Sequence, residues 1–261
     1  MTCRVVFNQK GGVGKSTITC NLAAISAARG RRTLVIDLDP QGNSTRYLLG
    51  PRAEELDSTL VDFFKEILSY SYKPKGAAGY IHETPFDNLH LMPAHPDLEE
   101  QQGKLESRYK MFKLRDALES LEGYDALYID TPPALNFFTR SALIAADRCL
   151  IPFDCDDFSR QALYTLLANV REIQEDHNNQ LKVEGIVVNQ FQSRARLPRE
   201  IVNELIMEEL PILKSYLSPS IRIRESHQHA RPMIHFDPRH KLTTEFEALY
   251  DTLSQDTQAT A

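Results

Sequence analysis

The sequence is poor in cysteine and lacks any long apolar run. Four cysteines in 261 residues (Cys3, Cys20, Cys149 and Cys155) are too few for a disulfide framework. They form neither a CxxC pair nor a metal-ligand spacing, so we expect buried or incidental thiols. No apolar run reaches the roughly 18 residues of a membrane-spanning helix, and the N-terminus has no apolar core of signal-peptide length. These absences predict a cytoplasmic protein.

An excess of basic charge is also absent. The chain has 30 Lys and Arg residues against 36 Asp and Glu residues, a formal net charge of -6. This balance excludes a wholly basic nucleic-acid coat protein but leaves room for a local basic patch. With 42% hydrophobic and 25% charged residues, the composition is that of an ordinary soluble globular protein.

Short apolar runs alternate with longer amphipathic stretches along the chain. The apolar runs are rich in β-branched residues and show no alternation, as in strands covered on both faces. This order predicts an α/β fold with a mostly parallel twisted sheet covered by helices on both faces. We expect one domain over residues 1–253 and a disordered polar tail over residues 254–261. The predicted strands are Arg4–Phe7, Thr33–Ile36, Leu89–Met92, Ala126–Ile129, Cys149–Ile151 and Val183–Val188, and the predicted helices are Ser16–Arg29, Met111–Leu121, Arg160–Glu175, Pro198–Glu209 and Lys241–Leu253.

The strongest signal is a glycine-rich loop between the first predicted strand and the first predicted helix. Residues 9–17 read Gln-Lys-Gly-Gly-Val-Gly-Lys-Ser-Thr, in the context that a phosphate-binding loop requires. Glycines let successive N–H groups turn toward an anion, and the helix N-terminus adds its positive end. We expect Lys15 to reach the β- and γ-phosphates, Ser16 to ligate Mg²⁺, and Thr17 to contact the α-phosphate. The predicted nucleotide-binding residues of the loop are Gly11, Gly12, Val13, Gly14, Lys15, Ser16 and Thr17.

A second lysine, Lys10, stands at the start of this loop. The strict pattern GxxxxGK[ST] fails, because its first glycine would fall at Gln9. The run instead resembles the deviant Walker A motif KGGxGK[ST] of the ParA/MinD ATPases. That resemblance implies a P-loop NTPase fold, ATP and Mg²⁺ as cofactors, and a homodimer in which Lys10 crosses to the phosphates bound by the other subunit. A group supplied in trans is worth about 10³–10⁵ in rate in other phosphoryl-transfer enzymes.

Acidic residues follow two more predicted strands. Asp37 and Asp39 follow one of them, and Asp130 follows another. Ligands of open α/β sheets lie beyond the carboxyl ends of strands, so these carboxylates are expected to face the phosphates. The resemblance implies that Asp39 positions the attacking water, which makes Lys10, Lys15 and Asp39 the catalytic residues. It also implies that Asp130 holds Mg²⁺ through a water, while Asp37 supports the loop or the metal's water shell.

Base recognition is assigned to one strand end. The resemblance places an adenine-contacting residue at Asn189, whose amide can donate and accept at the base edge. Family members also use a later segment near a proline for the base. The run Leu217-Ser218-Pro219 is offset by one residue from that pattern, so we assign no base contact there.

The resemblance covers nearly the whole chain and is closest to the ParA/Soj group of DNA-partition ATPases. It implies slow hydrolysis, a switch between a monomer and an ATP-bound sandwich dimer, and non-specific binding to nucleoid DNA. A ParB-like activator protein is the expected partner. The cargo is left open between a plasmid, a chromosome and a protein cluster, because these systems share fold and nucleotide site.

A basic segment in the acidic chain is consistent with DNA binding. Residues 190–241 hold nine Lys and Arg against six Asp and Glu, which is +3 locally in a chain of -6. The resemblance suggests that the DNA surface includes Arg194, Arg196, Arg222 and Arg224. The alternative is a solvated set of charges and ion pairs.

Other functions of the same superfamily fit the sequence less well. A MinD-like membrane-associated positioning ATPase needs a basic amphipathic C-terminal helix. No Lys or Arg follows Lys241, so we expect no membrane partner. A cluster-bearing reductase needs paired cysteines, and a bacterial tyrosine kinase needs a tyrosine cluster where the tail has only Tyr250.

Overall fold

The central element of the fold is a seven-stranded sheet. The computed structural model describes residues 1–69, 73–155 and 159–259. Over these residues the strand order is β3-β4-β2-β5-β1-β6-β7, and neighbours are parallel except for the edge strand β3, which is antiparallel to β4. The predicted α/β fold with a mostly parallel sheet is confirmed. The strands are β1 (Thr2–Val6), β2 (Thr33–Asp37), β3 (His82–Glu83), β4 (Leu89–Met92), β5 (Ala126–Asp130), β6 (Arg148–Asp154) and β7 (Lys182–Asn189).

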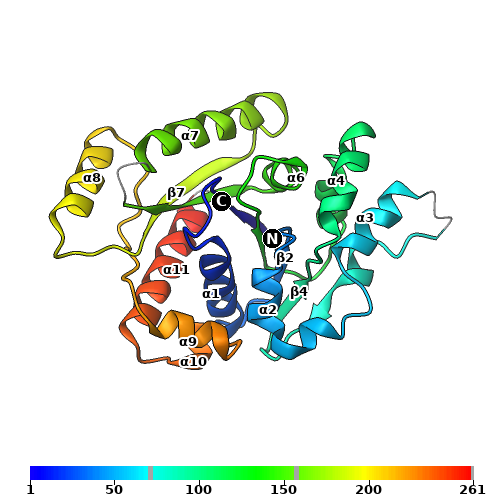
Figure 1. Ribbon diagram of the computed structural model, residues 1–261, viewed down its shortest axis with the longest axis horizontal. Coiled ribbons are helices and arrows are strands. Elements are labelled where there is room, and N and C mark those ends of the chain that lie inside the picture. Colours follow the sequence, from blue (N-terminus) through cyan, green and yellow to red (C-terminus); the bar gives the residue numbers. More distant parts are fainter. Residues whose placement is uncertain (70–72, 156–158, 260–261) are drawn as a thin grey trace.

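Helices cover both faces of this sheet (Figure 1). Successive strand residues point to opposite faces, so Val5 packs in one core cluster and Val6 in the other, both fully buried. The first cluster includes side chains of α3 to α8, and the second includes side chains of α1, α2 and α9 to α11. The α-helices are α1 (Lys15–Ala28), α2 (Asn43–Leu49), α3 (Leu60–Leu68), α4 (Leu98–Ser107), α5 (Lys113–Glu119), α6 (Phe137–Ala145), α7 (Ser159–Asp176), α8 (Arg196–Met207), α9 (Arg222–Gln228), α10 (Met233–Phe236) and α11 (Lys241–Ala259), and the 3-10 helices are η1 (Gly50–Glu54) and η2 (Ala77–Tyr80).

The last helix is longer than predicted. Helix α11 continues past Leu253 to Ala259. The predicted polar tail, 254–261, thus continues the helix over its described part, and residues 260–261 lie outside the described residues. No glycine or proline occurs between Ser254 and Ala259 to end the helix.

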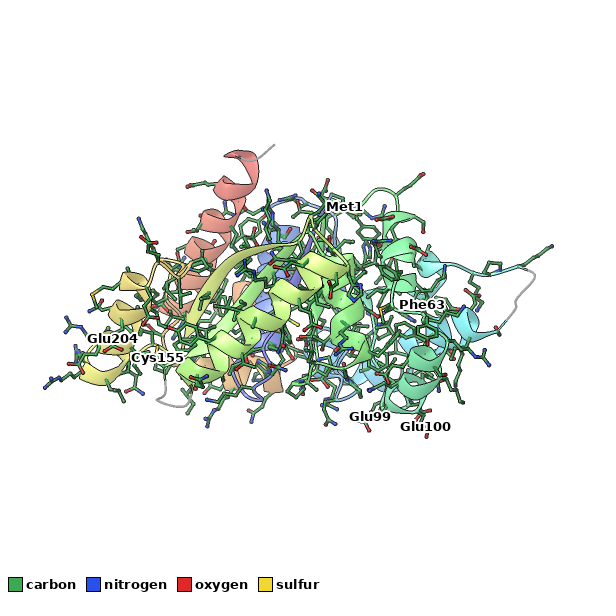
Figure 2. The ribbon with its side chains drawn as sticks, turned by 90° about the horizontal axis from the view of Figure 1, so that it is seen from above. Met1, Phe63, Glu99, Glu100, Cys155 and Glu204 are labelled. Carbon is green, nitrogen blue, oxygen red and sulfur yellow. The ribbon has the colours of Figure 1, made fainter. Side chains whose placement is uncertain are left out.

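Helix α8 lies at one end of the molecule. Figure 2 shows Glu204 on α8 at that end, and Phe63 on α3 toward the other. None of the helices that the structure describes is both long and apolar enough to cross a membrane.

The carboxyl ends of the central strands meet at one edge of the sheet. Val6 of β1 is the register partner of Asp130 on β5, which in turn pairs with Asp37 on β2. The glycine-rich loop leaves β1 at this edge and leads into α1. The topology therefore brings together residues from three separate parts of the sequence, as expected for a ligand site in an open parallel sheet.

Candidate functional site

The loop after β1 closely approaches the end of β7. Gly12 and Gly14 have φ of 76° and 91°, a conformation that glycine adopts without strain. A Cβ atom on Gly14 would lie 2.4 Å from Nδ2 of Asn189. The same Nδ2 donates a hydrogen bond of 2.9 Å to the carbonyl oxygen of Val13. Glycine is thus required at position 14 by backbone conformation and by the packing of Asn189.

The two lysines of the loop are joined by a hydrogen bond. Nζ of Lys15 donates to the carbonyl oxygen of Lys10 at 3.0 Å, and Lys15 is only 7% exposed. Burial lowers the pKa of Lys15, while Asp130 and Asp39 act in the opposite direction. The Lys10 N–H donates to Oδ1 of Asn8 at 2.8 Å, which fixes the start of the loop. An anion held by the loop would stabilise the partly desolvated charge of Lys15.

Asp37 supports the segment that follows β2. Its Oδ2 accepts hydrogen bonds from the N–H and the Oγ1 of Thr45, each at 2.7 Å. Burial raises the pKa of Asp37 well above its usual value, and the charge of Asp130 acts in the same direction. These contacts agree with the loop-supporting role expected for Asp37, whereas its contact with a metal-bound water stays a prediction.

The residues around Asp130 fit a Mg²⁺ ion held by Ser16 and, through water, by Asp130. Oδ2 of Asp130 accepts from the Ser44 hydroxyl at 2.7 Å. Oδ1 is buried and has no hydrogen-bond partner among the described residues. Burial raises the pKa of Asp130 to about 6, although the nearby hydroxyl groups of Ser16 and Ser44 lower it. A hydrated cation would supply both a donor for Oδ1 and a compensating charge, which is how Mg²⁺ commonly binds beside carboxylates.

Asp39 lies in the same pocket as the phosphate loop. This phosphate pocket, of about 310 Å³, is lined by Gly11, Gly12, Gly14, Lys15, Ser16, Thr17, Asp39, Gln41, Asn43, Pro133 and His227. Asp39 is 6% exposed, and its Oδ1 accepts from the N–H of Gln41 at 3.0 Å. Burial raises its pKa, against the effects of the Gln41 N–H and Lys15. A carboxylate of raised basicity therefore faces the loop that is predicted to hold the phosphates.

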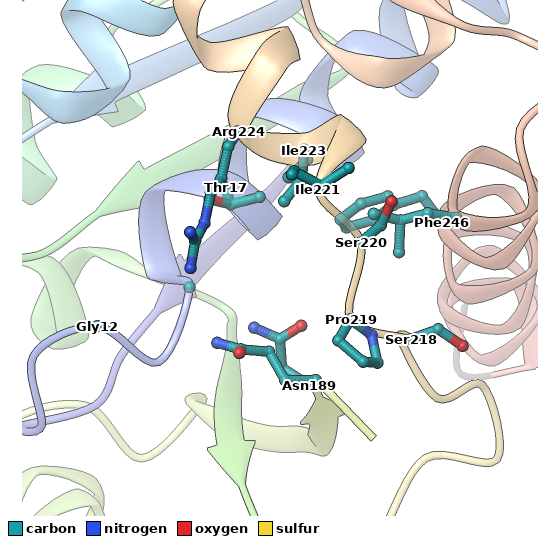
Figure 3. A pocket seen from close by; sticks show the side chains of 13 residues that line it. Gly12, Thr17, Asn189, Ser218, Pro219, Ser220, Ile221, Ile223, Arg224 and Phe246 are labelled. Atoms are coloured by element: carbon teal, nitrogen blue, oxygen red, sulfur yellow. The ribbon is translucent and has the colours of Figure 1, made fainter. Parts of the chain in front are cut away.

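A second, larger pocket continues from the phosphate pocket past Asn189 (Figure 3). The base pocket, as we name this space of about 460 Å³, shares Gly12, Gly14 and Thr17 with the phosphate pocket. The two pockets together extend from the phosphate loop to Asn189, where the base is predicted to lie. The other residues that line the base pocket are Gln190, Ser218, Pro219, Ser220, Ile221, Ile223, Arg224, Leu242 and Phe246.

Two residues that line the base pocket could not be placed there from the sequence. No base contact was assigned to Leu217-Ser218-Pro219, but Ser218 and Pro219 lie in the base pocket with Asn189. Backbone pairing explains their position, because the Leu217 N–H donates to the carbonyl oxygen of Val188 at 3.0 Å and the Phe191 N–H donates to the Leu217 carbonyl oxygen at 2.8 Å. The segment is aligned beside the end of β7 by main-chain contacts, which the offset of its proline does not prevent.

The four arginines predicted to bind DNA have different surroundings. Arg222 pairs with Asp237 at 3.0 Å and with Glu225, and it lies over the Phe236 ring. Arg224 is exposed and lines the base pocket. Arg194 is exposed, and Arg196 pairs with Glu200 at the surface of α8. For Arg222 these contacts favour the ion-pair alternative, and DNA contact stays a prediction for all four.

Comparison with known proteins identifies the family. A family model described as an AAA domain matches residues 1–183. The chromosome partitioning protein ParA of Myxococcus xanthus is 34% identical over 247 residues, which cover 94% of this chain and 84% of that protein. The chain belongs to the ParA/Soj family of P-loop ATPases. The sporulation initiation inhibitor protein Soj of Bacillus subtilis is 32% identical over 237 residues, covering 90% of each chain.

Solved structures share the fold of this chain. Cobyrinic acid a,c-diamide synthase from Mycobacterium smegmatis with bound ADP and magnesium matches with a TM-score of 0.81 and 25% identity, covering 100% of this chain and 96% of that chain. The cell division ATPase MinD of Pyrococcus furiosus matches with a TM-score of 0.78 and 23% identity, covering 97% and 98% of the two chains, which shows the shared fold. The cofactors of the ParA/Soj family are ATP and Mg²⁺.

Proposed function

We propose that this chain is a magnesium-dependent ATPase that dimerises around ATP, binds DNA without sequence preference and positions a cargo together with a ParB-like activator protein. The observation that best supports ATP hydrolysis is the position of Asp39. This buried carboxylate lines the phosphate pocket together with Lys15 and Ser16. The membership of the chain in the ParA/Soj family supports the link to partition.

Each residue of the site has a separate task in this proposal. The N–H groups of the loop and the Lys15 ammonium hold the phosphates, since both are donors directed toward an anion. Mg²⁺ bound at Ser16 and Asp130 would neutralise phosphate charge. Asp39 accepts a hydrogen bond from the attacking water and orients it, because its raised pKa makes it a better acceptor than an exposed carboxylate.

Lys10 is the proposed contact between subunits. Its N–H is fixed by Asn8 and its carbonyl by Lys15, so the backbone of Lys10 is anchored at the rim of the phosphate pocket. In an ATP-bound dimer its ammonium would reach the nucleotide of the other subunit. Because ATP then lies in the interface, nucleotide binding and dimerisation are thermodynamically linked. Intrinsic turnover should be slow, so that the ATP-bound dimer lasts until the activator arrives.

The DNA surface is assigned first to Arg194 and Arg196. Both precede or begin α8, at one end of the molecule, and both are exposed. Two-fold pairing of subunits doubles this patch. A dimer that neutralised about six phosphates would show log K falling with log salt at a slope of about -5. No base contacts are required for such binding.

Nucleotide and DNA binding measured together test the proposed function. The wild-type chain is expected to hydrolyse ATP only with Mg²⁺ and to retain DNA with ATP but not with ADP. Lys15→Ala should abolish both, because the phosphates lose their central cation. Lys65→Ala, a lysine on the exposed side of α3, is the matched control and should change neither. Tight ATP binding by Lys15→Ala would contradict the loop assignment.

A further inference from the structure

Helix α9 is held against the nucleotide site by an aromatic stack. The rings of Tyr47 on α2 and His227 on α9 are stacked, with centroids 3.9 Å apart and planes at 15°. Tyr47 is only 2% exposed, and its hydroxyl forms a hydrogen bond of 2.8 Å with Oγ of Ser226. Asn21 of α1 donates to the same hydroxyl at 3.3 Å. The Tyr47 ring on which His227 stacks is therefore held in place by hydrogen bonds from α1 and α9.

This stack directs His227 toward the phosphate loop. Its Nε2 lies 3.1 Å from Oγ1 of Thr17, within hydrogen-bond distance, and its side chain lines the phosphate pocket with Lys15 and Ser16. Desolvation lowers the pKa of His227, which favours the neutral ring with one N–H and one acceptor nitrogen. A donor from α9 thus stands beside Thr17, the residue expected to contact the α-phosphate.

Arg224 extends from the same helix to the other side of Thr17. Residues three apart lie on one face of a helix, so Arg224 and His227 both project from α9 toward the loop. Arg224 lines the base pocket with Gly12 and Thr17, and Figure 3 shows its side chain running from α9 toward the loop. No carboxylate of the described residues pairs with it, whereas its neighbour Arg222 is paired with Asp237 and Glu225. The guanidinium is thus directed at the junction of the two pockets.

We propose that Arg224 and His227 bind the α-phosphate of the nucleotide, so that α9 closes the site opposite the phosphate loop. The inference rests on the proposed binding of ATP. The guanidinium supplies a fixed fork of donors that suits phosphate oxygens. The His227 N–H supplies a neutral donor beside Thr17. Because the α-phosphate is common to ATP, ADP and AMP, this contact recognises a nucleotide without distinguishing its phosphorylation state.

Variants of the full chain test the assignment. Arg224→Gln and His227→Gln remove the two donors. Arg231→Gln and His229→Gln are matched controls, because both residues are exposed and line a separate pocket with Phe86 and His235. Dissociation constants are measured for ATP, ADP and AMP, and for adenosine by ligand-observed NMR. Circular dichroism and thermal unfolding establish that each variant is folded.

The expected result is an equal loss for all three phosphorylated ligands. Each of Arg224→Gln and His227→Gln should weaken ATP, ADP and AMP roughly tenfold, the effect of one lost hydrogen bond to a charged group. Adenosine should bind each variant as it binds wild type, and the two controls should bind every ligand as wild type does. Arg224→Lys should recover part of the loss, since it restores the charge without the planar fork.

Three outcomes would overturn the inference. Unchanged constants for ATP, ADP and AMP in both variants would show that α9 makes no phosphate contact. A loss confined to ATP would place the contact at the γ-phosphate. An equal loss for adenosine would show that the residues act by shaping the base pocket. Failure of wild type to bind ATP would instead refute the proposed function, so the two failures are distinguishable.

Discussion

Asp37 on β2 and Asp130 on β5 are register partners on adjacent parallel strands, and both side chains are fully buried. Burial raises the pKa of each carboxyl. Two buried carboxylates at neighbouring strand ends disfavour the folded state in the absence of a compensating cation. The arrangement is explained by the site that it builds, where a bound Mg²⁺ would compensate the charge.

Replacing Asp130 by asparagine should therefore stabilise the metal-free protein. The pKa of Asp130 rises from 3.8 to about 6 on folding, so at neutral pH its charge costs at most about 3 kcal/mol of unfolding free energy. The protonated carboxyl of Asp130 does not destabilise the wild-type fold below its unfolded pKa. The wild-type protein loses stability as the pH rises from the unfolded pKa through the folded pKa. The gain of Asp130→Asn should thus grow between about pH 4 and pH 6 and stay constant above.

Chemical denaturation across this pH range measures the effect, and isothermal titration measures Mg²⁺-dependent ATP binding, which the variant should lose. Asp116→Asn is the control, because Asp116 is exposed and its substitution should change stability little. A less stable Asp130→Asn protein that still binds ATP through Mg²⁺ would remove Asp130 from the metal site.

Gly14→Ala should destabilise the protein by more than the strain of a positive φ alone would. The new Cβ would lie 2.4 Å from Nδ2 of Asn189, in addition to the strain of φ 91°. Gly30→Ala is the matched control, because Gly30 has φ 81° at the other end of α1 and no atom within 4 Å of its Cβ position. Gly30→Ala should cost about 1–2 kcal/mol of unfolding free energy. Gly14→Ala should lower the unfolding free energy by more than Gly30→Ala does, and it should also lower the affinity for ATP. Equal unfolding free energies and equal ATP affinities of the two variants would contradict this prediction.

Arg194→Glu combined with Arg196→Glu should lose DNA binding and keep ATP hydrolysis. Four contacts vanish from each dimer, so most of the salt dependence should disappear. Arg171→Glu is the control, because Arg171 on α7 forms the same exposed pair with a glutamate four residues later as Arg196 does. Filter binding at several salt concentrations measures the DNA affinity of the double variant, the control and wild type. Equal DNA retention by the double variant and wild type would move the DNA surface elsewhere.

Asp39→Ala should bind ATP with nearly the wild-type affinity but hydrolyse it about 100-fold more slowly. The carboxylate acts on water in the transition state, so its loss lowers kcat rather than binding. Asp57→Ala, at an exposed aspartate, controls for the loss of one negative charge. Phosphate release under saturating ATP measures the rate. Wild-type turnover in Asp39→Ala would exclude Asp39 from its proposed role.

The phosphate loop and the mostly parallel α/β architecture could be predicted because both follow from local sequence patterns, whereas the order of the strands depends on pairing between distant residues. The strand before Gly12 and the helix after Lys15 follow from an apolar run and a helical pattern. The short helices α2 and α9 could not be predicted in this way. Both have seven residues and are held by tertiary contacts such as the stack of Tyr47 on His227.

The missing parts of the site depend on contacts between distant residues. Pro219 lines the same pocket as Asn189 because Leu217 pairs with the backbone at the end of β7, which no local pattern indicates. The charge pattern alone also did not indicate the ion pair of Arg222, because its partner Asp237 lies 15 residues further along the chain. Predictions of electrostatic surfaces need the positions of the opposing charges, which only the fold supplies.

The central claim is that the chain dimerises around ATP, and the oligomeric state of Asp39→Ala tests it most directly. This variant should keep ATP unhydrolysed while the oligomeric state is measured. With saturating ATP and Mg²⁺, light scattering should report a dimer, and with ADP a monomer. Adding Lys10→Ala should shift the ATP-bound protein back toward the monomer, while the control Lys65→Ala should not. An Asp39→Ala protein that binds ATP and Mg²⁺ to saturation but stays a monomer would contradict the account.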